Sequence, residues 1–443
     1  MTNLISQLKK LETSGVIRTS AQKSSITDLI TKAYRIRSRT PQLAAKKVAI
    51  LPGPLEDLVV NLLAFDGFCE AIYLCPANTT VPPVEGIHLW PLVSEASTDI
   101  KSPAISKQTT WYIPTSGTTG KPKWFGHTLE ALTANIKHST NLQKLTWGLL
   151  YQPFRFAGLQ VLLQALLSTA DLVDVTGLEP IKQVELMALH QVTAVSATPS
   201  LWRQLLMTQQ LDTLPLRHIT LGGEIAEQVL LTQLSRLFPK AKLRHIYAST
   251  EAGVGFVVAD GQAGFPTKWL DNPSSPIELD ISEKQHLLVK PKCSVESDAP
   301  LLLNSTGFMD TQDRIEIIGD RVFFLGRATG AINVGGNKVY PEKVEQVLLS
   351  CDAISQARVY AKKSAMMGEL VAADVVLLSD PLIMSSDPLI MSSDLSTIKL
   401  QILKECKKQL QRFEIPTKIS FVDNVSYNPS GKLNRQSNGK QHD

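Results

Sequence analysis

Short apolar runs alternate with amphipathic segments along most of the first 250 residues, and this alternation predicts strands followed by helices. Residues 48–51 form a compact apolar run that ends at Pro52-Gly53-Pro54. Residues 55–66 have helical periodicity, and residues 71–74 are apolar again. A strand, a helix and a second strand in this order predict a parallel pair joined by a right-handed crossover. Further strands are expected at 172–175, 194–197, 218–221 and 244–247, and further helices at 129–138, 158–168, 181–190, 199–208 and 226–237.

The two ends of the chain have other patterns. Leu4, Ile5, Leu8 and Leu11 fall on one stripe of a 3.6-residue repeat, so residues 1 to about 45 are expected to be helical. After residue 256 the pattern becomes short apolar alternations separated by turns, which predicts a small antiparallel β portion up to about residue 325.

The C-terminal region predicts a separate α+β unit. After Gly326-Arg327 the sequence predicts a hairpin, then a helix at 341–350, strands at 355–361 and 370–378, a helix at 395–411 and a strand at 417–423. Residues 380–386 are repeated at once as 387–393, which we interpret as an inserted surface loop. The predicted fold class is therefore α/β, with a large N-terminal domain of doubly wound sheets plus a small β portion (residues 1–327). A small mobile α+β domain (residues 328–443) follows it.

Ligands of doubly wound sheets bind outside the carboxyl ends of the strands. Loops that begin near Ser116, Thr198, Gly222 and Ser249 all follow predicted strands, so we expect them to face one cleft. The first of these loops, residues 115–123, contains threonines, a serine, two glycines and two lysines. Glycine lets backbone N–H groups converge on a phosphate, while hydroxyls and lysines add donors and charge. Its spacing differs from that of a Walker A loop, and by itself it fits an ordinary solvated turn equally well.

Composition and charge narrow the class of protein. A chain of 443 residues suggests two or three folding units, and 43% hydrophobic with 19% charged residues is typical of a globular protein. A net charge of +4 offers no basis for nucleic-acid binding. The five cysteines lack CxxC spacing, which argues against a disulfide framework or a zinc site. No signal peptide or membrane-spanning run is visible, so a cytoplasmic protein without membrane contact is expected.

Several further signatures follow the glycine-containing loop in a fixed order. They are Leu221-Gly222-Gly223-Glu224, Tyr247-Ala248-Ser249-Thr250-Glu251, Asp310-Thr311-Gln312-Asp313, Gly326-Arg327, Gly335-Gly336-Asn337-Lys338 and Pro429-Ser430-Gly431-Lys432. This order and spacing resemble the acyl-adenylate-forming superfamily, which includes acyl- and aryl-CoA ligases, adenylation domains of nonribosomal peptide synthesis, and luciferase. The resemblance extends from about Val48 to Arg435, which is most of the chain.

The resemblance implies a binding site for ATP. It assigns the β- and γ-phosphates to the loop, with Thr115, Ser116, Gly117, Thr118, Thr119, Gly120 and Lys123 as candidate ligands. It places Tyr247 on the adenine ring, and it places beside the nucleotide the residues Gly222, Gly223, Glu224, Ala248 and Ser249. Asp313 would bind the ribose hydroxyls with help from Arg327. Each of these side chains could instead be an ordinary core or surface residue.

Three residues would have catalytic roles under the same resemblance. Thr250 and Glu251 correspond to the Mg²⁺ site, where one carboxylate suffices because a cation that bridges phosphates takes few protein ligands. Lys432 corresponds to a mobile lysine that reaches the α-phosphate and the attacking carboxylate, where charge accumulates in the transition state. Otherwise Lys432 would belong to a basic tail.

The substrate pocket is where this sequence departs from the family. Its candidate residues are Phe154, Arg155, Gly158 and Thr198. Arg155 stands where many acyl ligases have histidine. If it lines the pocket, it favours a substrate with a second anionic or polar group; otherwise it points outward or pairs with a nearby carboxylate. Ala248 replaces the usual glycine after the tyrosine, and Thr329 replaces the usual aspartate or lysine of the hinge. Only about 110 residues precede the phosphate loop, fewer than in most relatives.

The resemblance predicts an ATP-dependent ligase. A small-molecule carboxylic acid, aryl or acyl, would react with ATP to give acyl-AMP and pyrophosphate, and the acyl group would then pass to the thiol of CoA. Two alternatives remain open at this point. The acceptor could be the phosphopantetheine of a carrier protein, or the chain could be a nucleotide-binding protein without turnover. The absence of an aspartate at 152–158 argues against amino-acid substrates.

Overall fold

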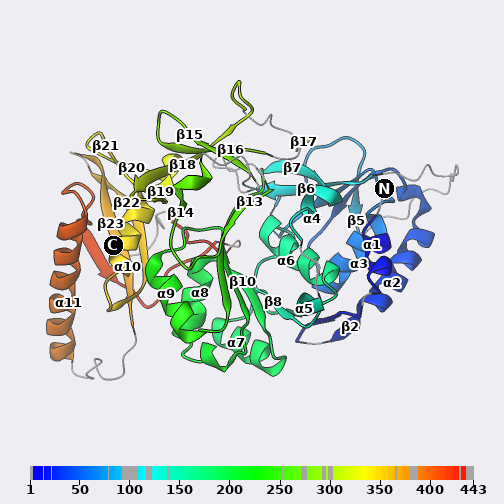
Figure 1. Ribbon diagram of the computed structural model, residues 1–443, viewed down its shortest axis with the longest axis horizontal. Coiled ribbons are helices and arrows are strands. Elements are labelled where there is room, and N and C mark those ends of the chain that lie inside the picture. Colours follow the sequence, from blue (N-terminus) through cyan, green and yellow to red (C-terminus); the bar gives the residue numbers. More distant parts are fainter. Residues whose placement is uncertain are drawn as a thin grey trace.

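The computed structural model describes residues 3–12, 14–20, 22–77, 79–91, 108–115, 122–136, 140–251, 253–270, 277–291, 296–297, 303–364, 367–378, 388–428 and 431–435. Figure 1 shows the N-terminal elements at one end of the molecule, the elements of the C-terminal region at the other, and the middle of the chain between them. The mixed α/β class that the alternation predicts is confirmed, and four sheets contain the described strands.

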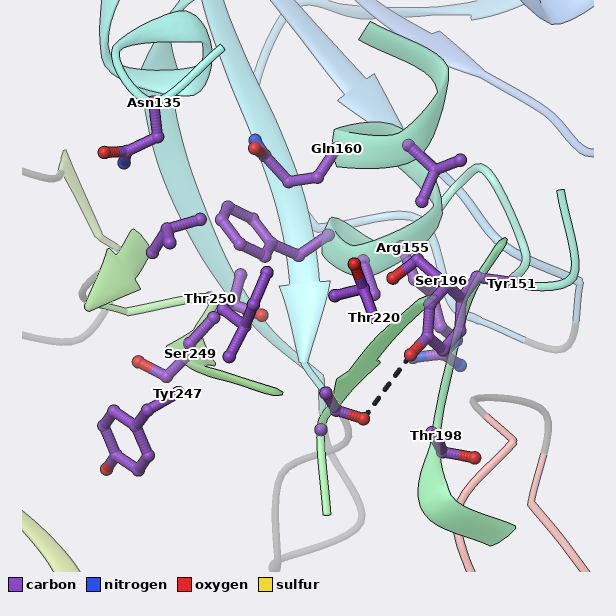
Figure 2. A pocket seen from close by; sticks show the side chains of 18 of the residues that line it. Asn135, Tyr151, Arg155, Gln160, Ser196, Thr198, Thr220, Tyr247, Ser249 and Thr250 are labelled. Atoms are coloured by element: carbon purple, nitrogen blue, oxygen red, sulfur yellow. Dashed lines mark hydrogen bonds between the residues drawn. The ribbon is translucent and has the colours of Figure 1, made fainter. Parts of the chain in front are cut away.

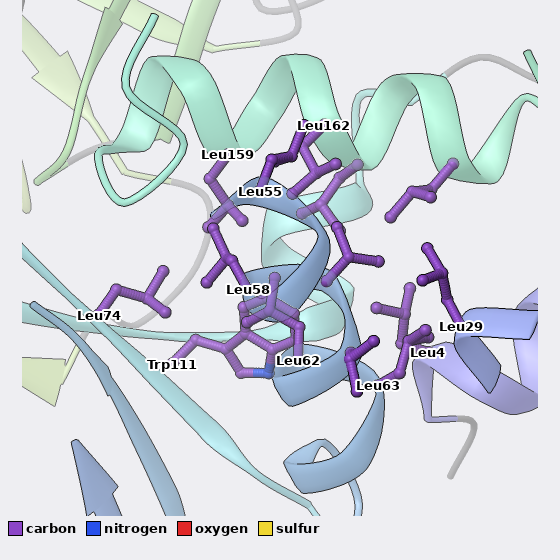
Figure 3. Packing of buried hydrophobic residues seen from close by; sticks show 14 of the residues in the cluster. Leu4, Leu29, Leu55, Leu58, Leu62, Leu63, Leu74, Trp111, Leu159 and Leu162 are labelled. Atoms are coloured by element: carbon purple, nitrogen blue, oxygen red, sulfur yellow. The ribbon is translucent and has the colours of Figure 1, made fainter. Parts of the chain in front are cut away.

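A six-stranded sheet contains the first predicted β-α-β unit. Its order is β17-β7-β6-β4-β3-β5, with β3 (Lys47–Ile50), β4 (Ala71–Leu74), β5 (Ile87–Trp90), β6 (Thr110–Thr115), β7 (Lys123–Thr128) and β17 (Glu296–Ser297). Strands β3 and β4 are parallel, and helix α3 (Leu55–Phe65) connects them. In Figure 3, Leu58 and Leu62 of α3 lie between Trp111 of β6 and Leu159 of helix α6 (Phe156–Leu167). Burying these side chains, each worth roughly 1.5–3 kcal/mol, joins this sheet to the next layer.

An eight-stranded sheet occupies the middle of the molecule. Its order is β13-β12-β11-β10-β8-β9-β1-β2, with β8 (Thr146–Leu149), β9 (Asp171–Asp174), β10 (Ala194–Ala197), β11 (His218–Gly222), β12 (Lys242–Ser249) and β13 (Gly253–Val258). Strands β9, β8, β10, β11 and β12 are parallel. The alternation predicts all of these strands except β8. The helices of this region are α4 (Leu129–Thr133), α5 (Thr140–Gln143), α6, α7 (Pro180–Leu189), α8 (Pro199–Met207) and α9 (Gln228–Leu237).

The prediction of continuous helix over residues 1 to 45 was wrong in part. Helices α1 (Leu4–Lys10) and α2 (Ile26–Arg39) form, but a hairpin of β1 (Val16–Arg18) and β2 (Lys23–Ser25) separates them. Ile17 of β1 pairs with Leu172 of β9, so a partner about 150 residues away decides the strand. Gly15 permits the approach, because a Cβ atom there would lie 2.8 Å from the carbonyl oxygen of Ala170.

The predicted antiparallel β portion is confirmed as a five-stranded sheet of order β14-β19-β18-β16-β15. Its strands are β14 (Phe265–Pro266), β15 (Glu278–Ile281), β16 (His286–Lys290), β18 (Met309–Ile318) and β19 (Arg321–Arg327). Aromatic residues fill its core, where Phe256, Phe265 and Trp269 pack against one another. Short 3-10 helices at Pro41–Leu43, Leu211–Thr213, Thr267–Trp269 and Ala328–Gly330 complete the connections before the C-terminal region.

The C-terminal region has its own sheet and its own core. The sheet has the order β21-β20-β23-β22, with β24 beside β23, and α10 and α11 complete the region. The elements are β20 (Ile332–Val334), β21 (Asn337–Val339), α10 (Pro341–Leu349), β22 (Ile354–Ser364), β23 (Gly368–Leu377), α11 (Pro388–Gln409) and β24 (Lys418–Phe421). Its apolar cluster draws only on residues 332–421.

The repeated heptapeptide lies at the start of α11. Residues 388–393 of the second copy are helical, so the prediction of a loop was wrong for them, while residues 379–387 lie outside the described residues. Within the part of the chain that the structure describes, none of the helices is both long and apolar enough to cross a membrane.

Candidate active site

The carboxyl ends of the parallel strands open into a cavity of about 1270 Å³. Thr198 follows β10, Gly222 ends β11 and Ser249 ends β12, and all three line this cavity. In Figure 2, Tyr247, Ser249 and Thr250 lie on one side of the cavity, with Arg155, Ser196 and Thr220 across from them. Three of the four loops expected to face one cleft therefore do so, while Ser116 of the fourth lies outside the described residues.

The segment 431–435 enters this cavity from the C-terminal region. The hydroxyl of Thr198 donates to the carbonyl oxygen of Gly431 (2.6 Å), and the amide of Leu433 donates to Oε1 of Glu224 (2.8 Å). These two bonds hold Lys432 over Gly223, where a Cβ atom would lie 3.3 Å from Cε of the lysine. Gly223 has φ +81°, a backbone conformation that favours glycine at this position.

The electrostatic surroundings of Lys432 are mixed. Its side chain is open to the cavity but surrounded by protein, and this burial, followed by the nearby Arg327 guanidinium, lowers its pKa below 10.5. The carboxylates of Glu224, Asp313 and Glu251 act in the opposite direction. The lysine is thus placed among residues that come from three distant parts of the sequence, in a cavity large enough for a nucleotide and an acid together.

Tyr247, Asp313 and Arg327 form one connected group. The Tyr247 hydroxyl donates to Oδ2 of Asp313 (2.6 Å), and Nε of Arg327 donates to Oδ1 of the same carboxylate (3.0 Å). Burial and the Asp313 charge raise the pKa of Tyr247 well above 10, so the phenol stays protonated. Tyr247 also stacks on Phe256 and Phe324, with ring centroids 5.1 and 5.3 Å away. Packing and hydrogen bonds thus fix the ring that the resemblance assigns to adenine.

Thr250 and Glu251 line the same cavity, and a residue that the sequence reasoning missed supports them. His127 of β7 is buried, and its Nε2 donates to the carbonyl oxygen of Thr250 (2.9 Å). Burial lowers the pKa of His127, although its bond to Thr250 and the Glu251 charge act in the opposite direction. Nothing but its place on a mostly apolar strand singled out His127 in the sequence.

The described residues contain no group of three or more His, Cys, Asp or Glu side chains that could hold a metal ion. A lone Glu251 carboxylate fits a cation whose remaining ligands are phosphate oxygens and water, which is how Mg²⁺ is usually bound beside nucleotides. The donor set therefore fits Mg²⁺ that arrives with ATP, and does not fit a resident metal.

The phosphate loop is described only at its ends. Thr115 and Lys123 face each other across the antiparallel pair of β6 and β7, and both line the cavity. Ser116, Gly117, Thr118, Thr119 and Gly120 lie outside the described residues. The strand pair thus brings both ends of the loop to the cavity.

Only two of the four residues expected in the substrate pocket line the cavity. Arg155 and Thr198 line the cavity, but Phe154 is buried in the core and Gly158 lies behind the wall. A Cβ atom on Gly158 would lie 2.2 Å from the carbonyl oxygen of Gln152, so this glycine serves the tight turn that begins α6. The wall itself consists of Tyr151, Phe156, Ala157, Gln160, Val161, Ser196, Thr220, Ile246, Ala248 and Val254, of which only Ala248 was a candidate.

Arg155 stands at this wall without a partner. Its Nε is buried and makes no hydrogen bond, and no carboxylate among the described residues forms an ion pair with it. Burial lowers the pKa of its guanidinium. Arg155 thus lines the cavity, and neither the outward-pointing nor the carboxylate-paired alternative is seen among the described residues.

Comparison with known proteins identifies the family. Residues 27–277 match the AMP-binding enzyme family, and residues 343–432 match the AMP-binding enzyme C-terminal domain. The first match alone covers more than half of the chain. The protein belongs to the AMP-binding enzyme family. Relatives named as CoA ligases, together with the family, support an enzyme, and this chain is an AMP-forming ligase.

Individual relatives of this AMP-binding enzyme are distant. A putative long chain fatty acid-CoA ligase of Staphylococcus epidermidis is 24% identical over 331 residues, 73% of this chain and 69% of the relative. A 2-succinylbenzoate–CoA ligase of Bacillus velezensis is 26% identical over 407 residues, 86% and 78% of the two chains. The solved structure of the anthranilate CoA ligase AuaEII with anthranoyl-AMP superposes with a TM-score of 0.73 at 13% identity, covering 98% of this chain and 95% of the other. At that identity the superposition shows the shared fold alone.

Proposed function

We propose that this AMP-binding enzyme activates a carboxylic acid with ATP and then transfers the acyl group to the thiol of coenzyme A. In the first step a carboxylate oxygen attacks the α-phosphorus, the bond to the pyrophosphate oxygen breaks, and acyl-AMP forms. In the second step the thiolate attacks the acyl carbon and AMP leaves. The observation that carries the proposal is Lys432, held by Glu224 and Thr198 inside the cavity that Glu251 and Arg327 also reach.

The chemistry of the first step explains this placement. A carboxylate must approach a polyanion, so a fixed cation is needed where negative charge accumulates. Lys432 supplies that cation, while Asp313 would accept the ribose hydroxyls and Tyr247 would stack on adenine. Mg²⁺, held by Glu251 and phosphate oxygens, would neutralise the leaving pyrophosphate. Each assignment is a proposal that follows from the arrangement of these side chains around one cavity.

The second step needs a different arrangement, because Lys432 occupies the space beside Gly223. We propose that the region after residue 327 rotates as a mobile domain, with residues 327–329 as its hinge. The Gly335-Gly336 hairpin would then face the cavity and guide the thiol. Names of relatives that are CoA ligases support coenzyme A as the acceptor. A carrier-protein phosphopantetheine is the alternative acceptor.

The test is acid-dependent pyrophosphate release across a broad panel of acids, followed by acyl transfer with CoA or with pantetheinylated carrier protein. Replacing Lys432 with alanine should lower pyrophosphate release by roughly 10²–10³, the cost of one lost transition-state donor. A near-normal rate in that variant would refute the role of Lys432. No release with any acid would favour the nucleotide-binding protein without turnover.

A further inference from the structure

Strands β11 and β12 turn one face of the eight-stranded sheet toward the cavity. Residues that pair across these two strands form rows on that face. Gly222 of β11 pairs with Ile246 of β12, Thr220 with Arg244, and His218 with Lys242, and all six line the cavity. At about 3.3 Å per residue in parallel strands, the second row lies about 7 Å and the third about 13 Å from the first. The first row lies next to Lys432, where the carboxylate would be activated. The distance of a residue from this row along the strands therefore gives its distance from the activated carboxylate.

This face of the sheet is polar, although its strands are parallel and internal. Parallel strands are usually covered by helices on both faces and are apolar on both. Here Ile219 and Leu221 are fully buried in the core beside α8 and α9, whereas His218 and Thr220 alternate with them along β11. Arg244 of β12 pairs with Thr220 and lines the cavity on the same face. The face opposite the helices is therefore adapted to contact polar groups of a ligand or water.

The third row and its neighbour Arg244 carry hydrogen-bond donors for which the described residues show no acceptor. Trp147 of β8 belongs to this row through Ala194, and its Nε1 is buried without a hydrogen-bond partner. Burial lowers the pKa of His218, and the nearby Arg244 and Lys242 cations lower it further. No carboxylate in the described ranges pairs with either cation. The acids of neighbouring elements are paired elsewhere: Glu227 with Arg203, Asp260 with Arg321, and Asp310 with His286.

The position of these donors distinguishes them from ordinary surface charges. Arg244 and His218 are half-buried, and Trp147 is 9% exposed, while Lys242 is exposed where the cavity opens to solvent. Between this end and Lys432 the wall offers Ser196 and Thr220. A ligand that extends from the activated carboxylate along the strands would pass these hydroxyls before it meets the cations.

We infer that Arg244, Lys242 and Trp147 form a distal subsite for an anionic group on the acid substrate. The preferred acid carries a second carboxylate, or a group of equal charge, about 7–13 Å from the carboxylate that is activated. Arg155, which lies beside Ser196 and Thr220 in Figure 2, would then contact a polar group of the acid between its two ends. This inference rests on the proposed function, because it takes Lys432 to mark the reacting end.

The test measures binding, so that it does not depend on turnover. Straight-chain dicarboxylic acids of increasing length, and monocarboxylic acids matched in length, are titrated calorimetrically into the AMP-saturated protein. We expect diacids of the matching length to bind more tightly than their monoacids. Arg244→Gln should weaken diacid binding roughly tenfold, the effect of one lost hydrogen bond to a charged group, and leave monoacid binding unchanged. Trp147→Phe removes the indole N–H and no other polar group, and it should also weaken diacid binding.

Arg217→Gln is the matched control, because Arg217 is exposed, adjoins His218 in sequence and does not line the cavity. This variant should bind diacids and monoacids as tightly as the wild type does. Equal binding of diacids and monoacids, or equal losses in Arg244→Gln and Arg217→Gln, would overturn the inference. Failure of the proposed function has a different signature, since it abolishes pyrophosphate release while leaving the dependence of binding on Arg244 intact.

Discussion

Glu224 joins the C-terminal segment to the nucleotide side of the cavity. Removing its side chain should slow adenylation but not the transfer of the acyl group to CoA. Its Oε2 accepts the amide of Ser200 (3.0 Å) within the same domain, while Oε1 accepts the amide of Leu433 (2.8 Å) beside Lys432. Only the second bond depends on the docked position of the lysine. Glu224→Ala should therefore weaken docking of Lys432 without unfolding the cavity.

The size of the effect follows from one charged hydrogen bond. Such a bond contributes about 1.5–3 kcal/mol, and about 1.4 kcal/mol corresponds to a factor of ten. Glu224→Ala should thus lower the rate of adenylation by about 10- to 100-fold. Glu224→Gln, which keeps an acceptor but not the charge, should lose less. Transfer from preformed acyl-AMP to CoA should be nearly unchanged, because that step does not need Lys432.

The assay compares acid-dependent pyrophosphate release with thioester formation from synthetic acyl-AMP in the same variants. Glu227→Ala is the control, because Glu227 lies three residues away and pairs with Arg203 rather than with the C-terminal segment. Equal losses in both half-reactions, or a comparable loss in Glu227→Ala, would refute the docking role of Glu224.

Three further predictions concern charge. Arg155→Leu should reduce kcat/KM for dicarboxylic or polar aryl acids about tenfold more than for plain fatty acids, and a uniform loss would remove its role in specificity. Adenylation should fall as pH rises through a Lys432 pKa below 10.5, because the ammonium is the active form; a pH profile of Lys432→Arg should lack this fall, and its persistence would assign the titration to another group. Burial raises the pKa of Glu342 from 4.5 to about 7, so the folded state loses stability as pH rises between these values. In chemical denaturation, the free energy of unfolding of Glu342→Gln should rise relative to that of the wild type by roughly 2–3 kcal/mol between pH 5 and pH 8. A difference that stays constant over this range would contradict the raised pKa of Glu342.

Local pattern alone determined most of the elements and the order of the motifs. Strands such as Ala71–Leu74 and Ala194–Ala197 were predicted to the residue, because an apolar run bounded by helices has few other solutions. The spacing of Gly222-Gly223, Thr250-Glu251, Asp313 and Lys432 was sufficient to indicate the family. Each of these features is encoded in neighbouring residues or in a fixed order along the chain.

Tertiary structure decided whatever depends on distant partners. The strand at Val16–Arg18 exists because β9 pairs with it, and Lys432 meets Gly223 because Thr198 and Glu224 bind the segment around it. The cavity wall was predicted only in part, since the tight turn below Gly158 directs Phe154 into the core and leaves Arg155 at the surface of the cavity. The register between β11 and β12 determines how far Arg244 and Lys242 lie from the reacting end of the cavity. A shift of one residue in this register would turn the side chains to the opposite face of the sheet, so the position of the two cations depends on how the strands pair.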